Sequence, residues 1–388
     1  MIVGTVKETY PGERRIALTP HVLPLLSKAG CEVLIEAGAG TDAGFPDDSY
    51  TEKGARTASS RKEVFDAADV LLQVRAYGAN LEQGRADLEL MREGQVLLGT
   101  FEPLTSLDAA REIASRGVTL FAMELMPRIT RAQSMDVLSS MATIAGYKGV
   151  LLAAEQLPKM FPMMMTAAGT VKPARVLILG AGVAGLQAIA SSRRLGAHVS
   201  AYDIRAEVKE QIESLGGKFV ELDLETGDSQ DAGGYAKAMG EEFYKRQREL
   251  LGKVIAENDV LITTAAVPGK RAPLLVTAEM ARGMATGSVI VDLAAERGGN
   301  CELTRPGETV VESGVTILGP LNLPASVPHD ASQMYSKNLV TLVQLMVKEG
   351  RLELDMEDEV ITGTMVTHKG EITNEQVRGA MGAAASPA

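Results

Sequence analysis

Short apolar runs alternate with helical patterns along the first third of the chain. The runs that predict strands are residues 2–6, 32–35, 70–74, 96–98 and 119–121. Helices are predicted at residues 21–29, where Thr19 and Pro20 provide an N-cap and a proline at the first helical position, and at residues 106–115. Strands that alternate with helices indicate βαβ units and a mostly parallel sheet.

From about Met135 the pattern becomes helical through residue 152, which predicts a long helix leading into a second domain. The α/β rhythm then repeats. Strands are expected at 175–179, 198–202, 218–220, 259–263, 288–292 and 315–318, and helices at 183–195, 206–215, 241–257 and 277–282, with a further helix at 336–348. The fold class is therefore α/β, with two Rossmann-like domains of mostly parallel sheets, joined by long helices with a cleft between them. A length of 388 residues also favours two domains.

Two further segments carry simple structural expectations. The run Met163-Met164-Met165 is expected to fill the core, since methionine fills irregular gaps easily. The alanine-rich end, residues 382–388, is expected to be disordered.

Composition narrows the class of protein. A net charge of −11 argues against nucleic acid or an anionic membrane surface as a partner, because both require basic patches. The chain opens on a strand-like segment, so no signal peptide is expected, and no direct membrane insertion either. Two distant cysteines and four scattered histidines predict neither a disulfide framework nor a metal site. The cytoplasm is the expected compartment.

A glycine-rich turn follows the strand at 175–179. Gly180, Gly182 and Gly185 form G-x-G-x-x-G: the first permits a tight turn, the second lets the backbone approach a pyrophosphate, and the third lets helix and strand pack closely. The next strand ends in Asp203, at the interval of about 20 residues where a carboxylate accepts from the ribose hydroxyls. This carboxylate favours NAD(H) over NADP(H), whereas Arg205 argues for caution. The structural alternative is a glycine turn that binds no cofactor.

A polar segment joins the two predicted domains, at the expected cleft. Within it, Arg128 is suited to meet a phosphate or Asp136, and Gln133 and Ser139 to bond a carboxamide or ribose. Spacing alone favours a simpler interpretation, namely a capped, polar helix start.

Two more features border the predicted cofactor pocket. Small residues end the later strands at 263–266, which includes Ala266, and at 292–294. They are expected either to line the pocket, because ligands bind beyond the carboxyl ends of such strands, or simply to pack. Residues 223–240 form a polar, acidic segment, interpreted from its composition as either a surface loop or a lid.

Several blocks of the chain resemble one family, the NAD(H)-binding component (domain I) of proton-translocating nicotinamide nucleotide transhydrogenase. The blocks are residues 123–140, residues 163–169, the turn 180–185 with Asp203-Ile204-Arg205, and Gly233-Gly234-Tyr235 with the two residues after it. The resemblance covers essentially the whole chain and belongs to the wider alanine dehydrogenase/transhydrogenase superfamily. It implies domains at 1–135 plus about 328–388, and at 136–327.

The resemblance also implies an activity: NADH passes hydride to NADP⁺ held on a partner β subunit, coupled to proton translocation by membrane subunits. The chain would be a homodimer, peripheral on the cytoplasmic face of the membrane through its partners. Catalytic roles are expected for Arg128, Gln133, Asp136, Ser139 and Tyr235, the last on a lid over the cofactor. Cofactor contacts are expected from Arg128, Ile129, Gln133, Asp136, Gly180, Gly182, Val183, Gly185, Asp203, Ile204, Arg205, Gly234 and Ala266.

Two alternatives remain at this point. Alanine dehydrogenase shares the N-terminal pattern of Glu8 and residues 15–20, but requires a first-domain histidine and lysine. No histidine lies between His21 and His198, so reductive amination lacks a proton donor, although Arg75 would still allow an anion to bind. The second alternative is a non-catalytic NAD(H) sensor.

Overall fold

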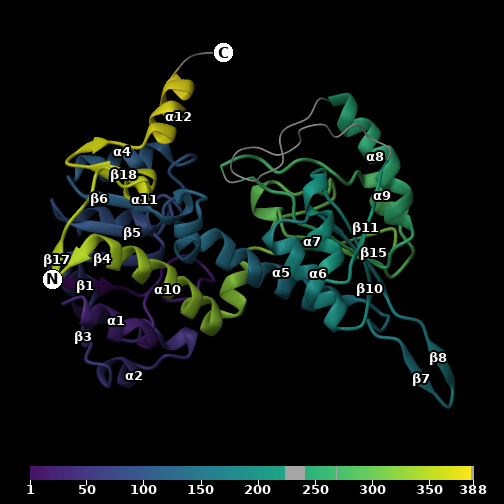
Figure 1. Cartoon of the computed structure of the whole chain (residues 1–388), viewed down its shortest axis with the longest axis horizontal. Helices are drawn as coiled ribbons and strands as arrows, with labels where there is room; N and C mark the ends of the chain where they lie inside the picture. The colour runs from purple at the N-terminus through teal and green to yellow at the C-terminus, as the bar shows by residue number, and fades with distance from the viewer. Residues whose placement is uncertain (223–240, 268, 386–388) are drawn as a thin grey trace. The chain divides into compact units, whose positions relative to one another are not determined.

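The computed structural model describes residues 1–222, 241–267 and 269–385. The chain divides into two compact units: unit 1 comprises residues 1–141 and 324–388, and unit 2 comprises residues 142–323. Each unit contains one large, mostly parallel sheet with helices on its faces (Figure 1). The predicted α/β class with Rossmann-like sheets is confirmed.

The sheet of unit 1 has the strand order β19-β18-β6-β5-β4-β1-β2-β3. All pairings from β6 to β3 are parallel, whereas β18 and β19 run antiparallel at one edge. The strands are β1 Ile2–Thr5, β2 Glu32–Glu36, β3 Arg56–Ala58, β4 Val70–Arg75, β5 Val96–Thr100, β6 Thr119–Ala122, β18 Met365–His368 and β19 Glu371–Ile372. The helices are α1 Leu23–Lys28, α2 Asp47–Thr51, α3 Arg61–Ala67, α4 Leu107–Ser115, α10 Pro328–Met346, α11 Glu359–Thr364 and α12 Glu375–Ala385, and a small ribbon pairs β16 Val347–Lys348 with β17 Arg351–Leu352.

Helices cover both faces of this sheet, so its central strands are apolar throughout. In β4, Val70 and Leu72 join a core cluster with α1 and α10, whereas Leu71 joins a second cluster with α3 and α4. This alternation follows from the two-residue period of a strand.

The C-terminal segment completes unit 1. The Ser332 and Ser336 hydroxyls on α10 accept hydrogen bonds from the backbone N–H groups of Ile16 and Thr19, both at 3.0 Å. Met365 of β18 then pairs with Phe121 of β6. α10 lies beside α1 and is visible in Figure 1 as the long yellow-green helix.

Unit 2 is built on the strand order β11-β10-β9-β12-β13-β15-β14, with only the β14–β15 pair antiparallel among the described strands of this sheet. The strands are β9 Arg175–Leu179, β10 His198–Tyr202, β11 Lys218–Phe219, β12 Val260–Thr263, β13 Val289–Asp292, β14 Thr309–Glu312 and β15 Val315–Leu318. The helices are α5 Val137–Gln156, which begins in unit 1, and α6 Val183–Arg194, α7 Lys209–Ser214, α8 Glu241–Ala256 and α9 Ala278–Arg282.

The methionine run does not fill a core, so that expectation is wrong. Met163, Met164 and Met165 are 59%, 40% and 76% exposed. β7 (Met164–Thr166) and β8 (Gly169–Val171) pair with each other as an isolated hairpin, seen in Figure 1 as an arm of unit 2. An isolated two-stranded ribbon has no second layer on which to bury its side chains.

The expected disorder of the C-terminal end is also wrong for residues 382–385, which belong to α12, and residues 386–388 lie outside the described residues. Val377 of α12 is fully buried in the second core cluster of unit 1, and this contact anchors the helix. Among the described helices, α5 alone is long and apolar enough to span a membrane, by length and composition only. Core helices of soluble proteins meet the same test, and a third of the apolar stretch of α5 is buried.

Candidate functional site

The candidate cofactor site lies at the carboxyl edge of the unit 2 sheet. β9 is flanked by β10 on one side and β12 on the other, so the chain reverses its direction of travel across the sheet at β9. Ligands of open α/β sheets bind outside the carboxyl ends of strands at such a switch point. Gly180 directly follows β9, and residues 264–266 follow β12.

Three glycines shape the turn between β9 and α6, each for a different reason. Gly180 has φ +97°, in the left-handed region that favours glycine. Gly182 is the N-cap residue of α6 and is exposed, and a Cβ built there meets nothing within 4 Å. At Gly185 a Cβ would lie 1.9 Å from the carbonyl oxygen of Gly180, so only glycine fits beneath the turn. The exposed N-terminus of α6, which begins at Val183, therefore offers N–H groups to an anion.

The structure joins this turn directly to Asp203. The backbone N–H of Ala181 donates to Asp203 Oδ2 at 2.7 Å, and that of Gly180 donates to the carbonyl of Tyr202 at 2.9 Å. Asp203 also accepts three hydrogen bonds from Arg205, and Ile204 packs against the core of unit 2. The two halves of the sequence fingerprint thus meet at the carboxyl ends of β9 and β10.

A buried polar network fixes the opposite wall of the site. Asn300 is fully buried, and its side chain accepts from the Ala265 N–H at 3.0 Å and donates to the Ala265 carbonyl at 2.8 Å. Its own backbone N–H donates to the buried carboxylate of Asp292 at 2.7 Å. The neighbouring Thr264 hydroxyl donates to the Gly180 carbonyl at 3.0 Å, and Ala266 is exposed beyond it.

Sequence reasoning did not identify Asn300. A signal was present in the two preceding glycines, because Gly298 and Gly299 both adopt positive φ, at +94° and +78°. Such a pair directly before an asparagine marks a backbone whose path is strictly constrained.

The polar segment of unit 1 contains the remaining described candidates. Arg128 and Gln133 are exposed, and Ile129 is half-buried against the core of unit 1. Asp136 precedes α5 and accepts from the backbone N–H of Ser139 at 2.9 Å and from its hydroxyl at 2.6 Å. This is the geometry of a helix N-cap, and it holds both side chains in fixed positions. Gly234 and Tyr235, with the rest of the predicted lid at 223–240, lie outside the described residues.

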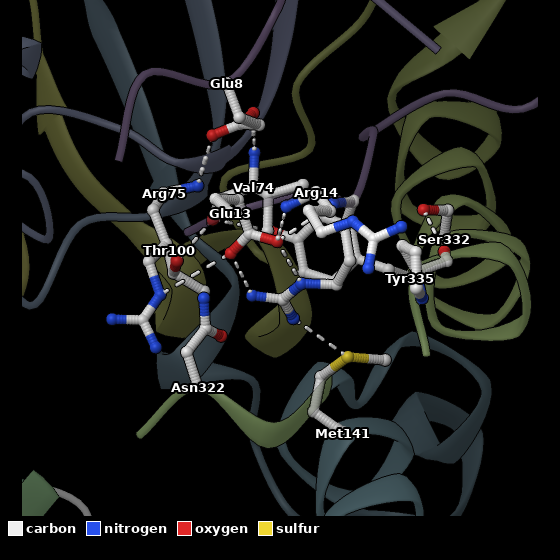
Figure 2. A network of polar contacts seen from close by, with 12 residues as sticks. Glu8, Glu13, Arg14, Val74, Arg75, Thr100, Met141, Asn322, Ser332 and Tyr335 are labelled. Carbon is white, nitrogen blue, oxygen red and sulfur yellow. Dashed lines mark hydrogen bonds and ion pairs between the residues drawn. The ribbon is translucent and has the colours of Figure 1, made fainter. Parts of the chain in front are cut away.

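A second concentration of charge lies at the carboxyl edge of the unit 1 sheet (Figure 2). Arg15 donates to both oxygens of Glu13, at 2.8 and 2.6 Å, and both side chains are buried. Arg75, considered above as an anion site, lies over the Tyr10 ring at 4.5 Å, with its Nε 3.8 Å from Glu13. Glu13 therefore supplies an internal carboxylate to both guanidinium groups.

Two carboxyl groups at this edge hold protons unusually tightly. Removal from water raises the pKa of Glu8 to about 7, although the backbone N–H groups of Val74 and Arg75 bond it. Removal from water and the nearby Glu102 carboxylate raise the pKa of Glu124 to about 7 as well. Glu124 Oε1 accepts from two backbone N–H groups, whereas its Oε2 is buried with no hydrogen-bond partner in the described part of the chain.

Comparisons with known proteins agree along the whole chain. Models for the N-terminal and C-terminal domains of alanine dehydrogenase/PNT match residues 4–145 and 149–375. The chain is 48% identical to an NAD(P) transhydrogenase subunit alpha of Rhodospirillum rubrum, over 98% of this chain and 99% of that one. A solved transhydrogenase from Sinorhizobium meliloti superposes with a TM-score of 0.83 at 42% identity, covering 97% of this chain and 99% of that one. An L-alanine dehydrogenase superposes with 0.82 at 26% identity, covering 99% and 100%.

A matched pair of glycine substitutions separates cofactor binding from packing. Gly182→Ala has room for its methyl group, so we expect the free energy of unfolding to change by less than about 0.5 kcal/mol. NADH affinity, measured by titration calorimetry, should fall about tenfold or more, because the methyl group blocks backbone approach to the pyrophosphate. Gly185→Ala should instead destabilise the chain by about 1–3 kcal/mol, since its methyl group meets backbone. Unchanged NADH affinity in a folded Gly182→Ala variant would contradict the role given to this glycine.

The raised pKa of Glu124 predicts a pH-dependent stability. In the folded chain the carboxyl keeps its proton up to about pH 7, whereas in the unfolded chain it loses the proton near 4.5, so its favourable contribution disappears as pH rises through this window. Glu124→Gln removes the titration and should gain about 2 kcal/mol over wild type between pH 5 and pH 8. Urea unfolding of both proteins at the two pH values measures the gain. Exposed Glu82→Gln serves as the control, and a gain that is equal at pH 5 and pH 8 would refute the assignment.

Proposed function

The chain belongs to the alanine dehydrogenase/PNT family, and within it we propose that it is the NAD(H)-binding component of a proton-translocating transhydrogenase. The observation that carries this proposal is the 48% identity to a transhydrogenase α subunit over nearly the full length of both chains. Identity to the alanine dehydrogenase of Bacillus subtilis is 27% over a similar span. The division of the family into two activities therefore favours the transhydrogenase side.

The unit 2 site supports NAD(H) as the bound cofactor. The exposed N-terminus of α6 offers N–H groups to the pyrophosphate, and Asp203 lies at the end of β10 where the adenosine ribose binds in this fold. A carboxylate at this position accepts from the 2′ and 3′ hydroxyls and repels a 2′-phosphate. NADP(H) is then the cofactor of the partner subunit.

The reaction is a direct hydride transfer. NADH gives hydride from its nicotinamide ring to the ring of NADP⁺ on the partner, leaving NAD⁺ and NADPH. Neither ring gains or loses a proton in this exchange, so the site requires alignment of two rings rather than a general acid or base. The absence of histidine from residues 22–197 agrees with this chemistry and disfavours amino-acid oxidation, in which an amine must exchange protons.

The segment at 128–139 orients the nicotinamide half of the cofactor. Gln133 supplies amide hydrogen-bonding groups for the carboxamide, and Arg128 supplies a positive charge for a phosphate. Asp136 and Ser139 contribute from positions already fixed by their mutual hydrogen bonds. Tyr235 closes over the bound cofactor from the 223–240 segment, as the resemblance to transhydrogenase domain I implies.

The coupling to proton movement belongs to the partner subunits. The chain binds membrane subunits and an NADP(H)-carrying β subunit, and acts as a homodimer at the cytoplasmic face of the membrane. Its net charge of −11 suits attachment through proteins rather than through anionic lipid.

A reconstitution assay tests the proposed function. The full chain is mixed with the NADP(H)-binding partner, NADH and an NADP⁺ analogue whose reduced form absorbs at a distinct wavelength. We expect reduction of the analogue that requires both proteins, and no turnover of NADH by the chain alone with pyruvate and ammonia. Robust alanine synthesis would establish the dehydrogenase instead. Tight NADH binding without hydride transfer to a folded, NADP⁺-loaded partner would favour the NAD(H) sensor.

Substitutions in the 128–139 segment test the positioning role. Gln133→Ala should slow hydride transfer by about tenfold or more, because misaligned rings react slowly, with a smaller loss of NADH affinity. Asp136→Asn should act in the same direction, since it weakens the bond to the Ser139 hydroxyl. Single-turnover kinetics and NADH titration measure the two quantities separately. Ser134→Ala, exposed in the same short helical segment, is the control, and equal slowing in that variant would remove the assigned role.

A further inference from the structure

The Asp203 carboxylate is fully occupied within its own chain. Its Oδ1 accepts from the backbone N–H of Arg205 and from Arg205 Nε, both at 2.9 Å. Its Oδ2 accepts from the backbone N–H of Ala181 and from Arg205 Nη2, both at 2.7 Å. A carboxylate offers about four lone-pair sites, so these four donors satisfy it.

The Asp203–Arg205 pair is also shielded from solvent. The two side chains are only 6% and 12% exposed, unlike the surface ion pairs of this chain, such as that of Arg305 and Glu308 with exposures of 69% and 60%. A two-point contact between a guanidinium and a carboxylate is among the stronger hydrogen-bonded pairs in proteins, and partial burial reduces its screening by salt. The contact is therefore more than a transient surface encounter.

This pairing competes with the function assigned to Asp203. Two ribose hydroxyls need two acceptor sites on the carboxylate. The backbone donors at 181 and 205 hold the turn itself, so only the two side-chain donors of Arg205 are able to leave without unfolding the loop. We propose that Arg205 is a specificity-determining residue: an internal counter-ion of the ribose site that NAD(H) must displace from Asp203.

The displaced guanidinium has a second consequence, for the competing cofactor. It is tethered two residues from Asp203, beside the position of the ribose 2′ group. A 2′-phosphate there would meet the positive charge of Arg205 as well as the negative charge of Asp203. Arg205 therefore lowers affinity for NADH and raises tolerance of NADPH, which narrows the discrimination that Asp203 alone would give.

The inference rests on the proposed function, because it assumes that the unit 2 site binds NAD(H). Binding of NADH to the wild-type chain therefore comes first. If wild type fails to bind NADH, the proposed function fails, and the role of Arg205 fails with it. If wild type binds NADH, the following comparison tests Arg205 alone.

The experiment is a titration of the full chain with NADH and with NADPH, in wild type and Arg205→Met. Methionine keeps an unbranched side chain of similar length and removes the charge and the donors. We expect NADH to bind about three- to tenfold more tightly and NADPH to bind at least about threefold more weakly, so that the affinity ratio changes by about tenfold or more. Opposite changes in the two affinities are not produced by general loosening of the site.

Two further variants complete the design. Arg205→Lys keeps a charge without the planar fork and should fall between wild type and Arg205→Met for both cofactors. Arg194→Met, an exposed arginine at the other end of α6, should leave both affinities unchanged. Weakened binding of both cofactors by Arg205→Met, or no change in either, overturns the proposal. If Arg205→Met does not fold, the same two affinities are compared in Arg205→Gln, for which the same expectations and contrary outcomes apply.

Discussion

The hydrogen bond from the Ala181 N–H to the Asp203 carboxylate joins the two elements on which the unit 2 site depends. It links the turn after β9 to the end of β10, and it forms only because Gly180 adopts a left-handed conformation that directs the next N–H toward the neighbouring strand. Gly185 then lets α6 pack against the Gly180 carbonyl, and Thr264 donates to the same oxygen from the end of β12. Three adjacent strands are thus coordinated through one turn, so the position of the helix N-terminus is fixed before any cofactor binds.

Much of this arrangement was predictable from local pattern. The strands at 175–179, 198–202 and 315–318 have the predicted limits, because parallel strands covered on both faces appear as short apolar runs bounded by glycine or charge. The fingerprint from Gly180 to Asp203 was predictable for a related reason: backbone geometry there demands particular residues. The pairing of Asp203 with Arg205 was not, because spacing shows which charges are near but not which contacts they prefer.

The failures have a common physical origin in contacts between distant parts of the chain. α10 begins at Pro328, earlier than the predicted residue 336, because Ser332 and Ser336 bond the backbone near residues 16 and 19 and so appear as polar breaks in an apolar pattern. The methionines at 163–165 were expected in a core because they are apolar, yet the hairpin that carries them pairs only with itself. Asn300 was missed since its importance lies in the backbone groups it clamps, at positions far away in sequence.

The two sheets show why similar topology does not give similar chemistry. Each has a strand with its sequence neighbours on opposite sides, β1 in unit 1 and β9 in unit 2, and charged residues gather at both carboxyl edges. In unit 1 the cations Arg15 and Arg75 face Glu13, and protonated carboxyls at Glu8 and Glu124 limit the remaining negative charge below about pH 7.

In unit 2 the charges are divided differently. The exposed Gly182 opens the N-terminus of α6, which carries a partial positive charge, whereas the Asp203 carboxylate is held one strand away by the turn that precedes this helix. An anion therefore suits the helix end, and hydroxyl donors suit the carboxylate. A dinucleotide supplies both groups in one molecule, which is why we assign the cofactor to unit 2 and a largely structural role to the charges of unit 1.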